Sequence, residues 1–244
     1  MDAVQLINIT KRFNIRPRSL KEFLPMRARG RAYEESFEAL SGVTLSIAQG
    51  SCVGLIGRNG SGKSTLLKII AGVTPPTLGT VLLRGTVCPL LELGAGFSPE
   101  LTGRQNIFLN GTILGMTGTE IASRVDSILD FAELSMFADL PVKRYSSGMI
   151  GRLGFAIAAH SQPDILLLDE ILAVGDELFR EKCYHAIRRF QASGVTIVLV
   201  SHSMESITKF CDRVAVLDHG AARFDGPPVP AVDFYHELLG TKTS

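Results

Sequence analysis

The chain has 244 residues, of which 45% are hydrophobic and 20% are charged, and its formal net charge at pH 7 is +1. This composition is typical of a globular protein large enough to bury a substantial core, and it argues against a disordered chain. The near balance of acidic and basic residues gives no sign of a general polyanion binder, and we expect no nucleic-acid partner, although local basic runs can still bind anions.

Further compositional features concern the cellular compartment. The cysteines Cys52, Cys88, Cys183 and Cys211 lack the spacing of zinc ligands, and we expect reduced, buried thiols. The N-terminus lacks the pattern of a secretory signal, and the longest apolar runs are much shorter than the ~20 residues that cross a bilayer. We therefore expect a protein that stays in the cytosol and reaches a membrane only through a partner.

The N-terminal third of the chain contains patterns of strands followed by a helix. Residues 4–9 and 45–47 predict two short strands of an N-terminal β region, and the arginine-rich stretch from Ile15 to Glu35 predicts an exposed insert. Residues 53–56 form an apolar run that leads into a glycine-rich loop. Residues 65–71 then predict a helix.

A mostly helical segment follows at residues 100–137. Thr117 and Glu120 have the spacing of a capping box. One helical face is apolar and carries Ile121, Val125, Ile128 and Leu129.

The C-terminal part alternates apolar strands with helices. Residues 165–170 and 195–200 read as buried strands, residues 177–191 as a helix between them, and residues 214–220 as part of an edge hairpin. Such alternation indicates a parallel sheet covered on both faces. The predicted fold is α/β, with a mostly parallel sheet, an N-terminal antiparallel β region and an inserted helical subdomain.

The most specific motif is the glycine-rich loop, which has the pattern G-x-x-x-x-G-K-S. Its residues are Gly57, Arg58, Asn59, Gly60, Ser61, Gly62, Lys63, Ser64 and Thr65. A strand before it and a helix after it direct the loop amides at phosphate groups. Lys63 is expected to reach the β- and γ-phosphates, and Ser64 to hold Mg²⁺. A phosphate-binding loop (P-loop) of this kind predicts an ATP or GTP binder. The alternative is a glycine-rich turn that binds no ligand.

Two adjacent carboxylates end the strand at residues 165–170. Asp169 is placed to bind Mg²⁺ through water, and Glu170 to act as the general base on the attacking water. The alternative is a solvated strand end, but together with the P-loop we favour catalysis.

The segment Tyr145-Ser146-Ser147-Gly148-Met149 precedes this strand and matches the signature sequence of a known family. The chain resembles the nucleotide-binding domain of ATP-binding cassette transporters over nearly every residue. The resemblance implies that two copies pair head to tail. Ser146, Ser147 and the Gly148 amide of one copy would then contact the nucleotide bound to the Lys63 loop of the other copy. Taken alone, Ser-Ser-Gly is more often only a helix cap.

Two more segments fit this resemblance. Ala173-Val174-Gly175-Asp176 lies where the family has a dimer-contact loop, which places Asp176 near the nucleotide. His202 follows the next strand, where the family has a switch histidine that touches the γ-phosphate and acts in catalysis. A lone histidine is usually structural.

The chain departs from the family at the glutamine that usually precedes the helical subdomain. The matching position is Leu93, and Glu92 beside it is a candidate substitute as metal contact. In this departure and in the neighbouring Leu-Glu-Leu-Gly-Ala-Gly-Phe segment, the chain resembles the exporters of bacterial O-antigen and teichoic acid. Some O-antigen exporters carry a further C-terminal carbohydrate-binding domain; from the short tail after Pro228 we expect either a member of a group without that domain or a shortened chain. The adenine ring is expected to stack on Phe13, with Phe37 as the competitor; the alternative is that these side chains belong to the core.

These observations predict one ATP-binding cassette domain over residues 1–244, with a nucleotide-binding core at 1–93 and 150–244 and a helical subdomain at 94–149. The predicted function is ATP hydrolysis that powers export of a lipid-linked surface polysaccharide. ATP and Mg²⁺ are the implied ligands. The implied partners are a second copy of the chain and an integral-membrane permease at the cytoplasmic face of the bacterial inner membrane. The alternative is a soluble cassette ATPase that acts on nucleic acid or ribosomes.

Overall fold

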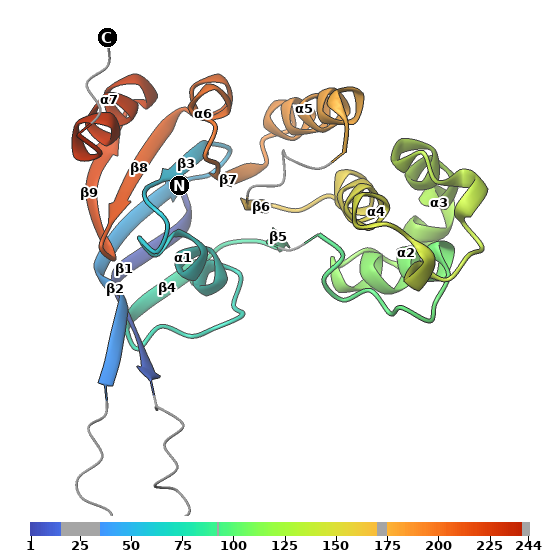
Figure 1. Ribbon diagram of the computed structural model, residues 1–244, viewed down its shortest axis with the longest axis horizontal. Coiled ribbons are helices and arrows are strands. Elements are labelled where there is room, and N and C mark those ends of the chain that lie inside the picture. Colours follow the sequence, from blue (N-terminus) through green and yellow to red (C-terminus); the bar gives the residue numbers. More distant parts are fainter. Residues whose placement is uncertain (16–34, 92, 170–174, 241–244) are drawn as a thin grey trace, which may run out of the picture.

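The computed structural model describes residues 1–15, 35–91, 93–169 and 175–240. The strands are β1 (Asp2–Ile15), β2 (Glu35–Ala48), β3 (Cys52–Ile56), β4 (Leu78–Leu83), β5 (Val87–Leu90), β6 (Ile165–Asp169), β7 (Thr196–Val200), β8 (Arg213–Asp218) and β9 (Ala221–Gly226). The α-helices are α1 (Lys63–Ile70), α2 (Gly103–Ile113), α3 (Gly118–Ala132), α4 (Ser147–Ala159), α5 (Glu177–Ala192), α6 (Met204–Phe210) and α7 (Pro228–Leu238). Figure 1 shows the strands with α1, α6 and α7 on one side of the molecule, and α2, α3 and α4 on the other. The predicted α/β class is confirmed.

The larger sheet is mostly parallel. Its strand order is β5-β6-β7-β3-β8-β9, and only the β8–β9 pair is antiparallel. Side chains of β6 alternate between two clusters of buried residues: Ile165 and Leu167 face α1, whereas Leu166 and Leu168 face the layer that contains α5 and α6. Because both faces are covered, these strands read as continuous apolar runs in the sequence. The expected C-terminal hairpin is confirmed as β8–β9.

The smaller sheet is antiparallel, with strand order β2-β1-β4. Its two long strands pair from Asp2 opposite Ala48 to Ile15 opposite Glu35, so both are much longer than the predicted strands at 4–9 and 45–47. Register shifts interrupt this pairing, and the outer halves carry polar side chains. The alternation of apolar and polar side chains that predicts a strand is therefore lost where β1 and β2 leave the core. In Figure 1 the two strands continue beyond the body as a two-stranded arm.

Helices α2, α3 and α4 enclose a separate cluster of buried apolar side chains (Figure 1). The predicted apolar face of α3 is part of it, and the predicted capping box is present. The Thr117 hydroxyl accepts from the Glu120 amide at 3.3 Å, while Oε2 of Glu120 accepts from the Thr117 amide at 2.8 Å. The Thr117 amide, followed by the Thr117 hydroxyl, donates to the Glu120 carboxylate and holds the pKa of Glu120 below its ordinary value.

We expect Thr117→Ala to destabilise the protein by about 0.5–2 kcal/mol, because the first turn of α3 loses its side-chain acceptor. A loss of about 1 kcal/mol corresponds to roughly 2–4 °C in Tm for a chain of this size. Thr119→Ala, two residues further along the same helix, removes no hydrogen bond of the capping box and is the matched control. Equal Tm values for the two variants in thermal unfolding would contradict the role of the cap.

All four cysteines are buried and free, as expected. Two of them, Cys52 and Cys211, lie next to each other, with their sulfur atoms 3.9 Å apart. None of the helices in the described residues has the length and apolar character needed to cross a membrane.

Candidate functional site

The P-loop connects β3 to α1 through a tight turn that only glycines permit. Gly57 has φ +154°, and a Cβ atom there would lie 2.1 Å from the carbonyl oxygen of Leu217. Gly62 has φ +105°, and a Cβ atom would lie 2.7 Å from the carbonyl oxygen of Ala39. The loop is thus pressed between β8 and β2, which explains why the motif requires glycine at these positions.

The interior of this loop suits a polyphosphate. The Lys63 side chain is buried at the start of α1, and its ammonium donates to the carbonyl oxygens of Gly57 at 2.8 Å and Arg58 at 2.9 Å. The Ser61 hydroxyl is buried without a hydrogen-bond partner. A buried polar group normally has a hydrogen-bond partner, so this hydroxyl indicates a place where a ligand binds. The amides at the start of α1 and the Lys63 charge make that ligand an anion. Arg58, Asn59 and Ser64 are exposed, and Thr65 is half-buried, so the loop opens to solvent.

Strand register brings the other predicted residues to the same sheet edge. Asp169 pairs with Val200 across β6 and β7, and Val200 pairs with Leu55 of β3. These parallel strands therefore end level, with the segment that leads to His202 between Asp169 on one side and the start of the P-loop on the other. Asp169 is half-buried and His202 is exposed. This edge is where ligands bind in open α/β sheets.

Some predicted residues lie outside the described residues. They are Glu170, the predicted general base, Glu92, the candidate metal contact, and Ala173 and Val174 of the predicted dimer-contact loop. Their roles remain predictions.

The segment Ser146–Gly148 forms the start of α4. The Ser146 hydroxyl accepts from the Met149 amide at 3.2 Å, so Ser146 is the N-cap of this helix. Ser146 and Ser147 are exposed and Gly148 is half-buried, which leaves the helix N-terminus open to a ligand. Helix α4 packs mainly against α2, α3, α5 and β5 rather than α1, so the structure does not bring this segment to the P-loop of the same chain.

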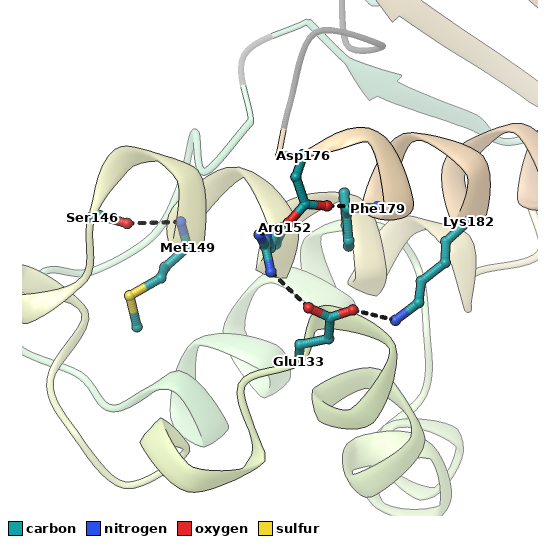
Figure 2. A network of polar contacts seen from close by, with 7 residues as sticks. All are labelled: Glu133, Ser146, Met149, Arg152, Asp176, Phe179 and Lys182. Carbon is teal, nitrogen blue, oxygen red and sulfur yellow. Dashed lines mark hydrogen bonds and ion pairs between the residues drawn. The ribbon is translucent and has the colours of Figure 1, made fainter.

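Asp176 lies at the N-cap of α5. Its carboxylate accepts from the Phe179 amide at 2.9 Å and from the guanidinium of Arg152 at 3.0 Å (Figure 2). The Phe179 amide, followed by the Arg152 charge, holds the pKa of Asp176 below its ordinary value. Arg152 was not predicted as a site residue, because one arginine within a helix carries no spacing signal that distinguishes it from a solvated charge.

The two candidates for adenine stacking lie directly opposite each other in the β1–β2 pair. Phe13 pairs with Phe37, and their exposed fractions are 42% and 50%. Opposite residues of an antiparallel pair share one face of the sheet, so the two rings form a single exposed aromatic surface. The Lys11 ammonium lies 5.1 Å from the centre of the Phe13 ring.

Comparisons with known proteins agree with this geometry. The ABC transporter family matches residues 40–173. The chain is 49% identical over 203 residues to the ABC transporter protein AbcA of Aeromonas salmonicida, covering 83% of this chain and 66% of AbcA. It is 45% identical to the O-antigen export system ATP-binding protein RfbB of Klebsiella pneumoniae, covering 89% of this chain and 88% of RfbB. It is 41% identical to the teichoic acids export ATP-binding protein TagH of Levilactobacillus brevis, covering 96% of this chain and 65% of TagH. The chain thus spans just under two thirds of AbcA and TagH.

Solved structures of ATP-binding cassettes also match this chain. The ATP-binding cassette MJ0796, solved as a dimer in a post-hydrolysis state bound to ADP and Pi, superposes with a TM-score of 0.75 at 26% sequence identity, over 92% of this chain and 98% of that chain. Fold, family match and relatives coincide, and the chain belongs to the ABC transporter family.

Proposed function

We propose that this chain binds and hydrolyses ATP and thereby powers export of a lipid-linked surface polysaccharide through a membrane permease. The observation that carries the proposal is the common sheet edge, which holds the P-loop, Asp169 and the segment that leads to His202. A P-loop alone would also suit kinases, GTPases and motor proteins. The family membership restricts the choice to a cassette ATPase.

Each part of the P-loop has a distinct task in binding ATP. The residues from Gly57 to Thr65 supply backbone amides, and the Lys63 ammonium neutralises the β- and γ-phosphates. Ser64 and Asp169 supply the hydroxyl and carboxylate oxygens that a Mg²⁺ ion prefers, and such an ion would neutralise charge on the phosphates. The exposed surface of Phe13 and Phe37 offers a stacking platform to the adenine ring.

Hydrolysis needs a base and an anchor for the γ-phosphate. We assign the base to Glu170, which directly follows Asp169 at the sheet edge. It takes a proton from water while the water oxygen attacks the γ-phosphorus and the bond to the β–γ bridging oxygen breaks, giving ADP and phosphate. His202 is assigned to contact the γ-phosphate from the end of β7.

The site is completed by a second copy of the chain. The N-terminus of α4 is exposed and suited to an anion, yet it does not pack against the P-loop of its own chain. Ser146, Ser147 and Gly148 are therefore assigned to the nucleotide of a partner cassette, with Asp176 near the contact. The dimeric state of MJ0796 supports this arrangement. The division into a core at 1–93 and 150–244 and a helical subdomain at 94–149 remains part of the proposal.

The assignment of a polysaccharide substrate rests on the names of the similar proteins. RfbB and TagH are named as ATP-binding proteins of O-antigen and teichoic acid export, and each matches most of this chain. In this proposal the chain lies at the cytoplasmic face of the inner membrane, attached through an integral-membrane permease.

Co-purification from detergent-solubilised membranes tests the partner. The proposal predicts recovery of a membrane protein with several spanning helices in a fixed ratio to the chain. Recovery of RNA or DNA in its place would contradict export and would favour a cassette ATPase that acts on nucleic acid or ribosomes.

A further inference from the structure

A cavity of about 490 Å³ lies at the C-terminal end of α4, between α3 and α5. Figure 1 shows these three helices as neighbours. The walls include Arg124 of α3, Arg189 of α5 and His160, the C-cap of α4, and none of the described residues that line the cavity is acidic. We call it the arginine cavity. Its volume is in the range of pockets that bind small molecules, roughly 300–1,000 Å³.

The arginine cavity lies at the opposite edge of the large sheet from the proposed nucleotide site. Two of its lining residues, Pro163 and Val195, come just before β6 and β7, so the cavity is at the amino ends of these strands. The P-loop follows the carboxyl end of β3, which is parallel to β7. The length of β7, about 16 Å at ~3.3 Å per residue, separates the two edges. A ligand in this cavity is therefore not the nucleotide of the P-loop.

The two arginines each use one contact to hold the end of α4. Nη1 of Arg124 donates to the carbonyl oxygen of His160 at 2.5 Å, and Nη2 of Arg189 donates to that of Ala159 at 2.5 Å. A guanidinium has five N–H donors, so each arginine keeps further donors for a ligand.

The charge of these arginines is not neutralised by a carboxylate. Neither of them forms an ion pair with an acidic residue in the part of the chain that the structure describes. The acidic residues near them in the sequence have other partners: Glu120 accepts from Thr117, Asp126 from Arg104, and Asp164 from Thr86. The arginine cavity therefore carries two positive charges, which favour an anion as its ligand.

The hydroxyl groups in the wall do not compete for this role, because each already donates to a carbonyl oxygen. The Ser161 hydroxyl donates to Ala158 at 2.7 Å, and the Ser193 hydroxyl donates to Phe190 at 3.0 Å. The guanidiniums thus remain the main donors for an anion.

His160 reports the electrostatic field of the arginine cavity. Its Nδ1 lies 2.8 Å from the carbonyl oxygen of Ala156, and because a carbonyl only accepts, this nitrogen carries a hydrogen. Burial lowers the pKa of His160, and the charges of Arg189 and Arg124 lower it further. An anion bound between the two arginines would oppose their effect and raise this pKa.

The rest of the wall is apolar. Ala159, Phe190 and Val195 are buried and line the same cavity. Apolar walls beside two guanidiniums suit a ligand with a compact body and a doubly charged head. A phosphate monoester fits this description, since it carries a charge of about −1.5 to −2 at pH 7. We propose that the arginine cavity binds a small organic phosphate monoester, whose phosphate group is held by Arg124 and Arg189.

Calorimetric titration with glucose 6-phosphate tests the proposal. We expect saturable binding of one molecule per chain, and no binding of glucose, which lacks the phosphate group. Arg124→Gln and Arg189→Gln should each weaken the binding at least about tenfold. A glutamine amide can still donate to a carbonyl at the end of α4, so these variants remove the charge and keep a donor for the helix.

Two further variants locate the binding. Arg188→Gln is the matched control, because Arg188 precedes Arg189 on α5 and also donates to a carbonyl oxygen, that of Lys209 at 3.1 Å, but does not line the cavity. We expect wild-type affinity for this variant. Lys63→Ala should also keep the affinity for glucose 6-phosphate, since the P-loop lies at the other edge of the sheet. Loss of binding in Lys63→Ala would place the ligand at the P-loop and overturn the inference.

The pH titration of the His160 ring by NMR gives a second, independent readout, with the signal identified by its absence in His160→Asn. Glucose 6-phosphate should raise the pKa of His160 by about one unit, and inorganic phosphate should act in the same direction. If neither compound binds saturably, the two arginines only hold the end of α4 and the inference is overturned. Equal affinities of Arg124→Gln, Arg189→Gln and Arg188→Gln would also overturn it. These outcomes leave the proposed ATPase function intact, because that function is measured by ATP turnover.

Discussion

Glu170→Gln is expected to lower ATP turnover by about 10²- to 10⁴-fold, the effect of losing a general base. The glutamine side chain has nearly the same shape but cannot take the proton from the attacking water. Binding of ATP should persist, since the groups assigned to the phosphates, Lys63 and the amides of the P-loop, are unchanged. The ATP-bound dimer should then accumulate, because hydrolysis no longer reopens it.

Single-turnover hydrolysis of bound ATP and gel filtration in the presence of ATP measure the two effects. Glu181→Gln is the matched control, since Glu181 is exposed on α5 and has no assigned role. Turnover of Glu170→Gln close to the wild-type rate would show that another group activates the water.

Lys63→Ala is expected to weaken ATP binding by about 10²-fold, since hydrogen bonds to charged groups contribute roughly 1.5–3 kcal/mol each. The ammonium is buried within the loop, where it also bridges the carbonyl oxygens of Gly57 and Arg58. Its loss removes both the positive charge for the phosphates and a support of the loop itself.

Equilibrium binding of a fluorescent ATP analogue measures this effect. Lys68→Ala is the control, because Lys68 lies in the last turn of the same helix and is exposed. We expect its affinity for the analogue to match that of the wild type. Equal affinities for Lys63→Ala and the wild type would exclude the P-loop as the phosphate site.

The parts of the fold that the sequence predicts well are those where packing imposes a period. Strands β6 and β7 are buried on both faces and appear as apolar runs, and α3 has both an apolar face and a capping box. The sequence predicts the start of α1 at Thr65, two residues after its true start at Lys63, because the loop glycines lead directly into the helix. The ranges of the short strands β4 and β5 are not predicted. Most of the β4 side chains are exposed, so its sequence carries no clear alternation.

A second capping box at the start of α2 was also missed. Thr102 and Gln105 exchange hydrogen bonds of 3.2 Å and 2.9 Å in the same pattern as Thr117 and Glu120. The T-x-x-Q spacing is visible in the sequence and could have located this helix.

The candidate site shows the same division between local and distant information. The P-loop is a local motif, so its turn and the helix that follows could be predicted from nine consecutive residues. The contact between Arg152 and Asp176 joins positions that are 24 residues apart on two helices, so no local sequence pattern predicts it. The pairing of Phe13 with Phe37 depends on the register of β1 and β2, which is set by the whole hairpin.

The central claim is an ATPase site shared between two copies of the chain, and its most direct test is specific ATPase activity as a function of protein concentration. At saturating ATP, a shared site exists only in the dimer. The account therefore predicts that activity per chain rises with protein concentration and then reaches a plateau as dimers saturate. Activity per chain that stays constant on dilution to concentrations at which sedimentation shows only monomers would contradict it.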